Sequence, residues 1–163
     1  MTTSLPQAAI ATSHVTHGGA DYWLEREAGT TTLVVTSDDE AAYAGFAGSP
    51  DNGTFRAPTT GDNALALRKA LPWLTPVKRG IATSAGTGDR LGICTPGHAA
   101  AFQEVGGGIN PVFAQQSIRE MGRTHRQPRD VLDDATWGAF RQGWTGTVGA
   151  DADHLKTTDD IDR

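Results

Sequence analysis

Carboxylate, imidazole and amine side chains are concentrated near the end of the chain, in Asp151-Ala152-Asp153-His154-Leu155-Lys156. Alternate residues of an extended strand face opposite sides, so Asp151 and Asp153 share one face and His154 the other. A strand end that breaks this alternation would bring Asp153 and His154 into one pocket. Imidazole and carboxylate are ligands for a divalent metal, and a carboxylate beside a metal also acts as a base. From spacing alone, a solvated loop after a strand is the more common outcome, and the metal pocket is the alternative.

A second polar group, Gly86-Thr87-Gly88-Asp89-Arg90, follows an earlier strand candidate. Glycines here let backbone N–H groups approach an anion, but a dinucleotide fingerprint needs a third glycine and a helix that starts inside the motif. Asp89 and Arg90 would instead lie at the carboxyl end of a strand, where α/β folds bind substrates. A tight turn with a local Asp–Arg pair accounts for the same residues, and both interpretations stay open.

Amide and guanidinium groups follow the next strand candidate, at Gln115, Gln116 and Arg119. They would hydrogen-bond a hydroxylated or carboxylated ligand, or else serve in capping and solvation. Asp133 and Asp134 lie on a long helix pattern and are predicted to face solvent. Cys94 has no neighbouring base or cation that marks a nucleophile, so a small core residue is expected there.

The segments that must position these residues alternate between strand and helix from residue 79 onward. Strands are predicted at 80–84, 111–115 and 148–154, and helices begin near Thr95, at Ser117 with Glu120 as a capping box, and at Pro128. This order is typical of parallel α/β folds. A complete (β/α)₈ barrel needs roughly 200 to 250 residues, more than the part of the chain after residue 78 supplies. We therefore expect residues 79–163 to be the first strand-helix units of an incomplete barrel.

The earlier part of the chain is predicted to be an arm followed by a small α+β extension. Residues 1–20 are mostly small and polar, which indicates a weakly ordered arm. Residues 21–78 form the extension. It should hold a strand at 31–36, a short helix to about Phe46, a loop over 47–61 and a helix that begins at Asp62 or Asn63 and ends near Pro72.

Composition limits the possible partners and the compartment. Lys and Arg number 14 against 19 Asp and Glu, a net charge of −5, which argues against nucleic-acid binding. The single cysteine excludes an intrachain disulfide and fits a reducing compartment. No signal peptide and no run of about 20 apolar residues is present, so we expect a cytoplasmic protein with no membrane association.

Four ordered segments of this chain resemble the tagaturonate epimerase family, whose members interconvert tagaturonate and fructuronate. The likeness covers about residues 80–163, with a weaker likeness at about 62–76. Its segments are Gly88-Asp89-Arg90-Leu91-Gly92 with Thr95-Pro96-Gly97-His98, Pro111-Val112-Phe113-Ala114-Gln115-Gln116-Ser117-Ile118-Arg119-Glu120-Met121, Asp133-Asp134-Ala135-Thr136-Trp137-Gly138, and Gly149-Ala150-Asp151-Ala152-Asp153-His154-Leu155-Lys156-Thr157.

The resemblance implies a TIM-barrel-like epimerase that acts on a small sugar acid, depends on a divalent metal cation, and is longer than this chain. Carried over by position, His154 is expected to be a metal ligand and Asp153 the catalytic base, although the two roles are interchangeable at this stage. Substrate-facing residues would then be Asp89, Arg90, Gln115 and Lys156.

The resemblance also constrains the chemistry, because the two sugar acids differ at a carbon β to the ketone and simple enolisation cannot invert it. Retro-aldol cleavage and re-addition, with Asp153 as base, and a transient hydride shift are the two open routes. Two other interpretations remain: a module that binds an anionic small ligand, and an incomplete, non-catalytic fragment. In that last case a complementing chain or self-association would cover the open sheet edges.

Overall fold

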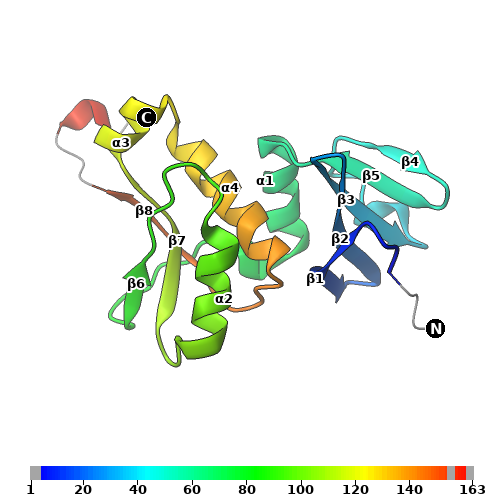
Figure 1. Cartoon of the computed structure of the whole chain (residues 1–163), viewed down its shortest axis with the longest axis horizontal. Helices are drawn as coiled ribbons and strands as arrows, with labels where there is room; N and C mark the ends of the chain where they lie inside the picture. The colour runs from blue at the N-terminus through cyan, green and yellow to red at the C-terminus, as the bar shows by residue number, and fades with distance from the viewer. Residues whose placement is uncertain (1–4, 154–156, 161–163) are drawn as a thin grey trace. The chain divides into compact units, whose positions relative to one another are not determined.

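Two separate β-sheets form the fold, one antiparallel and one parallel (Figure 1). This computed structural model describes residues 5–153 and 157–160. The chain divides into two units, residues 1–71 and 72–163, each of which is described by itself. The sequence places the change of character at residue 79, so this division lies several residues earlier than expected.

The first unit is built on a five-stranded antiparallel sheet with strand order β1-β2-β3-β5-β4. The buried centre of this sheet includes apolar residues on the neighbouring strands β2 and β3, among them Leu24, Leu33, Val34 and Val35. The β-branched run predicted as a strand at 31–36 lies within β3, which is confirmed. The five strands are β1 (Ala9–His17), β2 (Ala20–Glu27), β3 (Thr30–Ser37), β4 (Ser49–Asp51) and β5 (Thr54–Pro58).

The expectation of a weakly ordered arm over residues 1–20 is wrong for the segment that forms β1. This strand pairs with β2 in antiparallel register, from Ala9 opposite Glu25 to His17 opposite Ala20. Its polar composition follows from its place at the edge of the sheet, where most of its side chains meet solvent. The hydroxyl of Ser13, buried in the strand, accepts a hydrogen bond from the N–H of Leu24 at 2.8 Å and so ties β1 to its neighbour.

The region from residue 38 to residue 61 also differs from expectation. Only a single 3₁₀ turn, η1 (Glu40–Ala42), forms where a helix to Phe46 is predicted. The predicted loop contains β4 and β5, joined by Asn52 and Gly53 with φ of 48° and 80°. Two consecutive residues in the left-handed region make the turn that an Asn-Gly pair favours between antiparallel strands.

Helix α1 (Gly61–Ala70) is confirmed, and polar contacts fix its start. The Thr60 side chain accepts a hydrogen bond from the Asn63 N–H, which is ordinary N-cap geometry. Asn63 is fully buried, and its amide bonds to both backbone groups of Ala47 and to the carbonyl of Pro58. These contacts attach the helix to the segments that flank β4 and β5.

The second unit holds a three-stranded parallel sheet with order β6-β7-β8. The coarse expectation of parallel strand-helix units is therefore confirmed for this part of the chain, although the first strand begins at Ser84 and not at residue 80 as predicted. Its elements are η2 (Pro72–Leu74), β6 (Ser84–Gly86), α2 (Thr95–Val105), β7 (Asn110–Ser117), α3 (Ile118–Thr124), α4 (Pro128–Arg141), β8 (Gly149–Asp153) and η3 (Thr158–Asp160).

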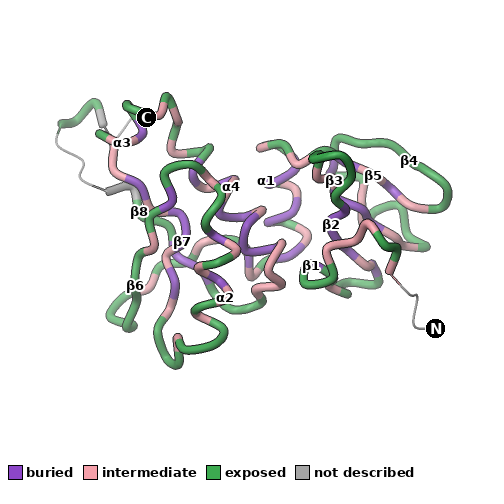
Figure 2. The backbone as a smooth tube through the Cα atoms, viewed as in Figure 1, coloured by how far each residue is buried: buried purple, intermediate pink, exposed green. Residues whose placement is uncertain are grey.

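The core of this unit lies between β7 and the helices α2 and α4, which pack on β7 and on each other. Phe113 on β7 makes edge-to-face contacts with Phe102 and Trp144, at ring distances of 5.8 and 5.4 Å. Figure 2 shows the buried residues of β7 and α4 beside the exposed strand β6. Among the described residues, no helix is long and apolar enough to cross a membrane.

Candidate functional site

The carboxyl ends of the three parallel strands bring several of the predicted site residues to one edge of the sheet. Strand β6 pairs with β7 up to Gly86 opposite Val112, and β7 pairs with β8 up to Ser117 opposite Asp153. Parallel strands end at the same edge, which is where α/β folds bind their ligands. Asp89 follows β6, and Gln115 is near the end of β7. The structure thus brings three predicted segments together.

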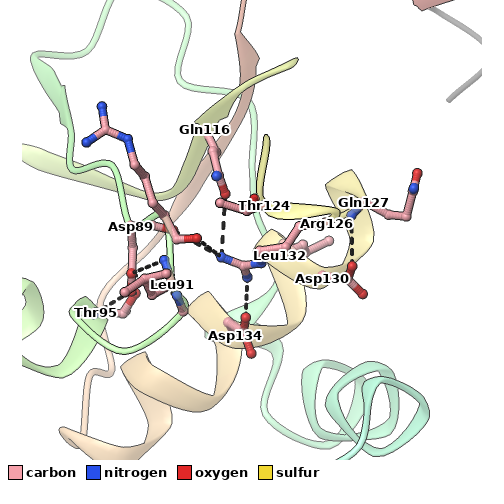
Figure 3. Close-up of polar contacts among 12 residues, drawn as sticks. Asp89, Leu91, Thr95, Gln116, Thr124, Arg126, Gln127, Asp130, Leu132 and Asp134 are labelled. Atoms are coloured by element: carbon pink, nitrogen blue, oxygen red, sulfur yellow. Dashed lines mark hydrogen bonds and ion pairs between the residues drawn. The ribbon is translucent and has the colours of Figure 1, made fainter. Parts of the chain in front are cut away.

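Asp89 is the centre of the loop between β6 and α2. Its carboxylate is buried, with 5% of the residue exposed. One oxygen accepts hydrogen bonds from the N–H groups of Leu91 and Gly92, at 3.2 and 2.8 Å. The other accepts from the N–H groups of Cys94 and Thr95, at 2.6 and 3.1 Å (Figure 3). The N–H groups of the N-cap residue Cys94 and of Thr95, the first residue of α2, are therefore capped by a side chain five and six residues earlier.

This arrangement alters two predictions at the start of α2. Thr95 is the first helical residue and not the cap, since Cys94 occupies the N-cap position and makes no side-chain cap bond. Cys94, expected in the core, is exposed. The Asp89 carboxylate supplies the capping acceptor from the preceding loop in place of a side chain at the N-cap position.

The same contacts control the charge of Asp89. Burial acts to raise the pKa of this carboxyl, and the backbone hydrogen bonds from residues 91–95 outweigh it, so the pKa lies below its ordinary value. Asp89 is therefore an anion at neutral pH. Because both oxygens are already hydrogen-bonded within the loop, the geometry assigns this carboxylate to holding the loop, while substrate contact by Asp89 stays a prediction.

Arg90 extends from this loop toward solvent and pairs with Glu120 on α3. The Arg90 side chain is 68% exposed and the Glu120 side chain 17% exposed. The hydrogen bond to Glu120 raises the pKa of Arg90. The hydrogen bond from Arg90 lowers the pKa of Glu120, and the charges of Arg119 and Arg123 add to this lowering. An exposed guanidinium thus stands beside two further cations at the edge of the sheet.

Gln115 and Gln116 point to opposite sides of β7. The Gln115 side chain lies across β6, where a Cβ on Gly86 would be 2.6 Å from the Gln115 Cδ. Glycine at position 86 is what allows this close approach. Gln116 is only 4% exposed, and its Oε1 accepts a 3.5 Å hydrogen bond from Arg126. Gln115 is thus the more accessible of the two amides, while its contact with substrate stays a prediction, and Gln116 belongs to the packed interior.

Arg126 is the main residue of this site that sequence reasoning missed. It lies between α3 and α4, and its side chain is 13% exposed. Its guanidinium donates to the backbone carbonyls of Asp89 and Arg90 at 3.2 and 3.0 Å and forms an ion pair with Asp134 on α4 (Figure 3). No sequence motif predicts this residue, because the carbonyls of Asp89 and Arg90 that it binds lie 37 and 36 positions away along the chain.

The acidic pair on α4 also differs from the prediction of a solvated face. Asp133 is 6% exposed and bonds to Arg129 within the helix, at 3.3 Å. Burial raises the pKa of Asp134, with the charge of Arg126 acting in the opposite direction and nearby carboxylates adding to the rise. The helix therefore turns these carboxylates toward basic partners as well as toward water.

The end of β8 is described only in part. Gln115 stands opposite Asp151, which is exposed, and Ser117 stands opposite Asp153. His154 and Lys156 lie outside the described residues. Among the side chains that the structure describes, those of residues 5–151 and 157–159, no group of three or more His, Cys, Asp or Glu is suited to hold a metal ion. The described residues alone therefore do not supply a metal-ligand set, and the metal roles stay predictions.

Comparison with known proteins identifies close relatives of this chain. A family model described as tagaturonate epimerase matches residues 11–163. A tagaturonate/fructuronate epimerase of Thermotoga maritima is 54% identical over 100 residues, which are 61% of this chain and 20% of that protein.

Solved structures of the fructuronate-tagaturonate epimerase UxaE from Cohnella laeviribosi extend the likeness to three dimensions. Its native form and a complex with one glycerol each superpose with a TM-score of 0.85 at 32% identity. Each match covers 94% of this chain and 31% of that chain. This chain therefore spans less than a third of the length of these relatives.

Proposed function

This chain belongs to the tagaturonate epimerase family, and we propose on that premise that it forms the N-terminal part of an enzyme that epimerises tagaturonate and fructuronate. The observation that carries the proposal is the family match over residues 11–163. The convergence of Asp89, Arg90 and Gln115 at the carboxyl edge of the parallel sheet supports it. Such edges are where parallel α/β enzymes act on their substrates.

We further propose that β6, β7 and β8 are the first strands of a TIM-type barrel. Two features support this: the strands are parallel, and α2 and α4 both pack on the central strand β7. Strand β6 and the exposed Leu91 and Ile93 leave apolar and hydrogen-bonding surface to be covered. The rest of the longer protein would cover it, and a complementing chain or self-association is the alternative.

In this proposal the exposed Arg90 binds the sugar-acid carboxylate, because a guanidinium pairs with a carboxylate through two parallel hydrogen bonds. Gln115 and Lys156 bind hydroxyl or carbonyl oxygens, and Asp89 keeps the loop that carries Arg90 in place. Asp153 removes the proton of the hydroxyl on the carbon whose configuration is inverted. The adjacent C–C bond then cleaves, its electrons form the enolate of the ketone, and re-addition to the other face of the aldehyde inverts the centre.

A transient hydride shift is the competing route, in which the hydride of the inverted carbon would move to the ketone carbon of the same substrate and return to the other face. His154 is proposed as one ligand of a divalent metal cation, which would polarise the substrate carbonyl when bound. The other ligands would come from outside the described residues. Elemental analysis of the full-length protein, with and without His154→Ala, tests this assignment. We also propose a cytoplasmic location, which the single cysteine supports because it fits a reducing compartment.

Nuclear magnetic resonance of fructuronate incubated with the full-length protein tests the proposed activity. We expect tagaturonate to form, and Asp153→Asn to reduce the rate by a factor of about 10² to 10⁴, the usual contribution of a general base. The exposed Asp38 of the other unit provides a matched control, since Asp38→Asn should leave the rate unchanged. No tagaturonate from the wild-type protein at any metal concentration would refute the proposal.

A binding module for anionic small ligands is the second candidate, favoured by the exposed Arg90 beside Arg119 and Arg123. It predicts that the protein binds fructuronate without converting it and without requiring a metal. Calorimetric titration of the same preparation separates the two functions, because only the enzyme would both bind and interconvert the sugar acids.

A further inference from the structure

We propose that Arg126 is a positioning residue of this site, which holds the backbone of the β6–α2 loop so that Arg90 is presented to the substrate. The inference rests on the proposed function and adds a residue that none of the motifs of this chain includes. Its basis is a set of hydrogen bonds that joins three segments distant in sequence: the β6–α2 loop, β7 and α4.

The donors of one guanidinium account for all these contacts. Nη1 donates to the carbonyls of Asp89 and Arg90, at 3.2 and 3.0 Å, and more weakly to Gln116 Oε1 at 3.5 Å. Nη2 pairs with the Asp134 carboxylate. The planar fork of arginine places donors on two nitrogens at fixed angles, which the single ammonium of a lysine cannot reproduce.

The backbone of Arg126 is itself held from both sides, so its side chain starts from a fixed point. His125 closes α3 in the left-handed conformation, with φ of 54°, and the Arg126 N–H bonds to the Met121 carbonyl at 3.0 Å. On the other side, the Gln127 N–H donates to the Asp130 carboxylate at 2.8 Å as part of the capping box that opens α4. Little conformational freedom is left to lose when Arg126 binds the loop.

The loop is consequently anchored through both kinds of backbone group. Asp89 accepts from its N–H groups, whereas Arg126 donates to its carbonyls. Gly92, with φ of 73°, packs against the Asp134 side chain that pairs with Arg126. The backbone of Arg90 is therefore held while its side chain remains 68% exposed. Loss of the Arg126 contacts would release the backbone from which the Arg90 guanidinium extends.

Arg79 provides a matched control at the opposite edge of the same sheet. Its Nη1 donates to Asn110 Oδ1 and Thr147 Oγ1, at 3.2 and 2.7 Å, and its Nη2 to the Pro111 carbonyl at 3.4 Å. These partners lie at the amino ends of β7 and β8. Arg79 thus joins separate segments much as Arg126 does, but away from the edge that carries Arg90.

The experiment compares Arg126→Lys and Asp134→Asn with Arg79→Lys in the full-length protein. We expect both site variants to raise KM for fructuronate by about tenfold or more, because small displacements of a binding group are costly. Arg79→Lys should lower the melting temperature and leave KM within about twofold. Asp134→Asn weakens only the ion pair with Arg126, so KM can still be measured on this variant if Arg126→Lys does not fold.

Hydrogen exchange of the amides of residues 89–95 gives a second readout that does not need activity. We expect faster exchange there in Arg126→Lys and Asp134→Asn than in Arg79→Lys. An active wild-type protein whose site variants keep its KM overturns the inference and leaves the proposed function standing. An inactive wild-type protein refutes the proposed function. The exchange data then decide the inference, which fails if the loop stays equally protected in all three variants.

Discussion

Substitution of Asp89 by asparagine removes the charge from the side chain that organises the β6–α2 loop and turns one of its acceptors into a donor. The buried Thr95 is the N–H donor least able to find water as a new partner, so the amide oxygen should turn toward Cys94 and Thr95. The new NH₂ group would then face the N–H groups of Leu91 and Gly92, and two hydrogen bonds would be lost.

The size of the effect follows from those two bonds. A hydrogen bond to an ionised acceptor contributes about 1.5–3 kcal/mol. Leu91 is 70% exposed, so water replaces part of its loss. We therefore expect Asp89→Asn to lower the free energy of unfolding by about 2–4 kcal/mol at neutral pH, which is larger than the loss of an ordinary N-cap.

The effect should also depend on pH, in a direction set by the lowered pKa of Asp89. A carboxyl whose pKa is lower in the folded state stabilises the protein at pH values above the pKa of the unfolded state, near 3.8. This contribution is lost as the pH falls through the folded-state pKa. Asparagine does not titrate. The difference between wild type and variant should therefore shrink as the pH falls below about 5 and through the lowered pKa of Asp89.

Urea denaturation followed by circular dichroism measures both quantities, with the exposed Asp38→Asn as the control for a change of charge alone. The control should change the free energy of unfolding by less than about 0.5 kcal/mol. The reasoning is refuted if Asp89→Asn changes it by no more than the control, or if its effect is the same at neutral and acidic pH.

Two further substitutions test the packing around the site and in the first unit. Gly92→Ala should lower the free energy of unfolding by about 2–3 kcal/mol, because φ is 73° at this position and the new methyl group would overlap the Asp134 carboxylate on α4. Gly97→Ala is the control and should not lower it, because there is open space around Gly97. Arg56→Met should lower the free energy of unfolding by about 2–3 kcal/mol, because it removes the guanidinium that pairs at 2.5 Å with the Glu25 carboxylate, whose side chain is only 6% exposed. Arg26 is exposed, so the control Arg26→Met should change this free energy by less than about 0.5 kcal/mol. Urea denaturation checks both pairs, and equal values within either pair would contradict the corresponding argument.

The helices were the best predicted elements, because their signals are local. Ser117 accepts a hydrogen bond from the Glu120 N–H at the start of α3, and α4 begins at Pro128, as the capping patterns indicate. Of the five strands of the antiparallel sheet only β3 was predicted, and the edge strands β1 and β4 and the interior strands β2 and β5 were missed. A polar edge strand such as β1 has the composition of a disordered segment, and only its pairing with β2 makes it a strand. The Asn52-Gly53 pair was a hairpin signal that sequence reasoning overlooked.

For the candidate site, residue type and position along the chain pointed to Asp89, Arg90 and Gln115, because they follow strands in a parallel strand-helix order. Their partners were not predictable. Asp134 looked like part of a solvated face, and Arg126 belonged to no pattern. The contact between Arg126 and the carbonyl of Asp89 joins residues 37 positions apart, and such a contact leaves no periodic trace in the sequence.

The sequence by itself determined which residues can do chemistry and on which local elements they lie, since capping, turn preference and hydrophobic period act over only a few residues. Three features were decided by the tertiary structure alone. The Asp89 carboxylate accepts hydrogen bonds from its own loop, the Arg90 side chain is exposed, and Arg126 donates hydrogen bonds to the backbone carbonyls of Asp89 and Arg90. The physical reason is that a buried charge or N–H group must find a partner wherever the fold brings one near, whatever its distance along the chain.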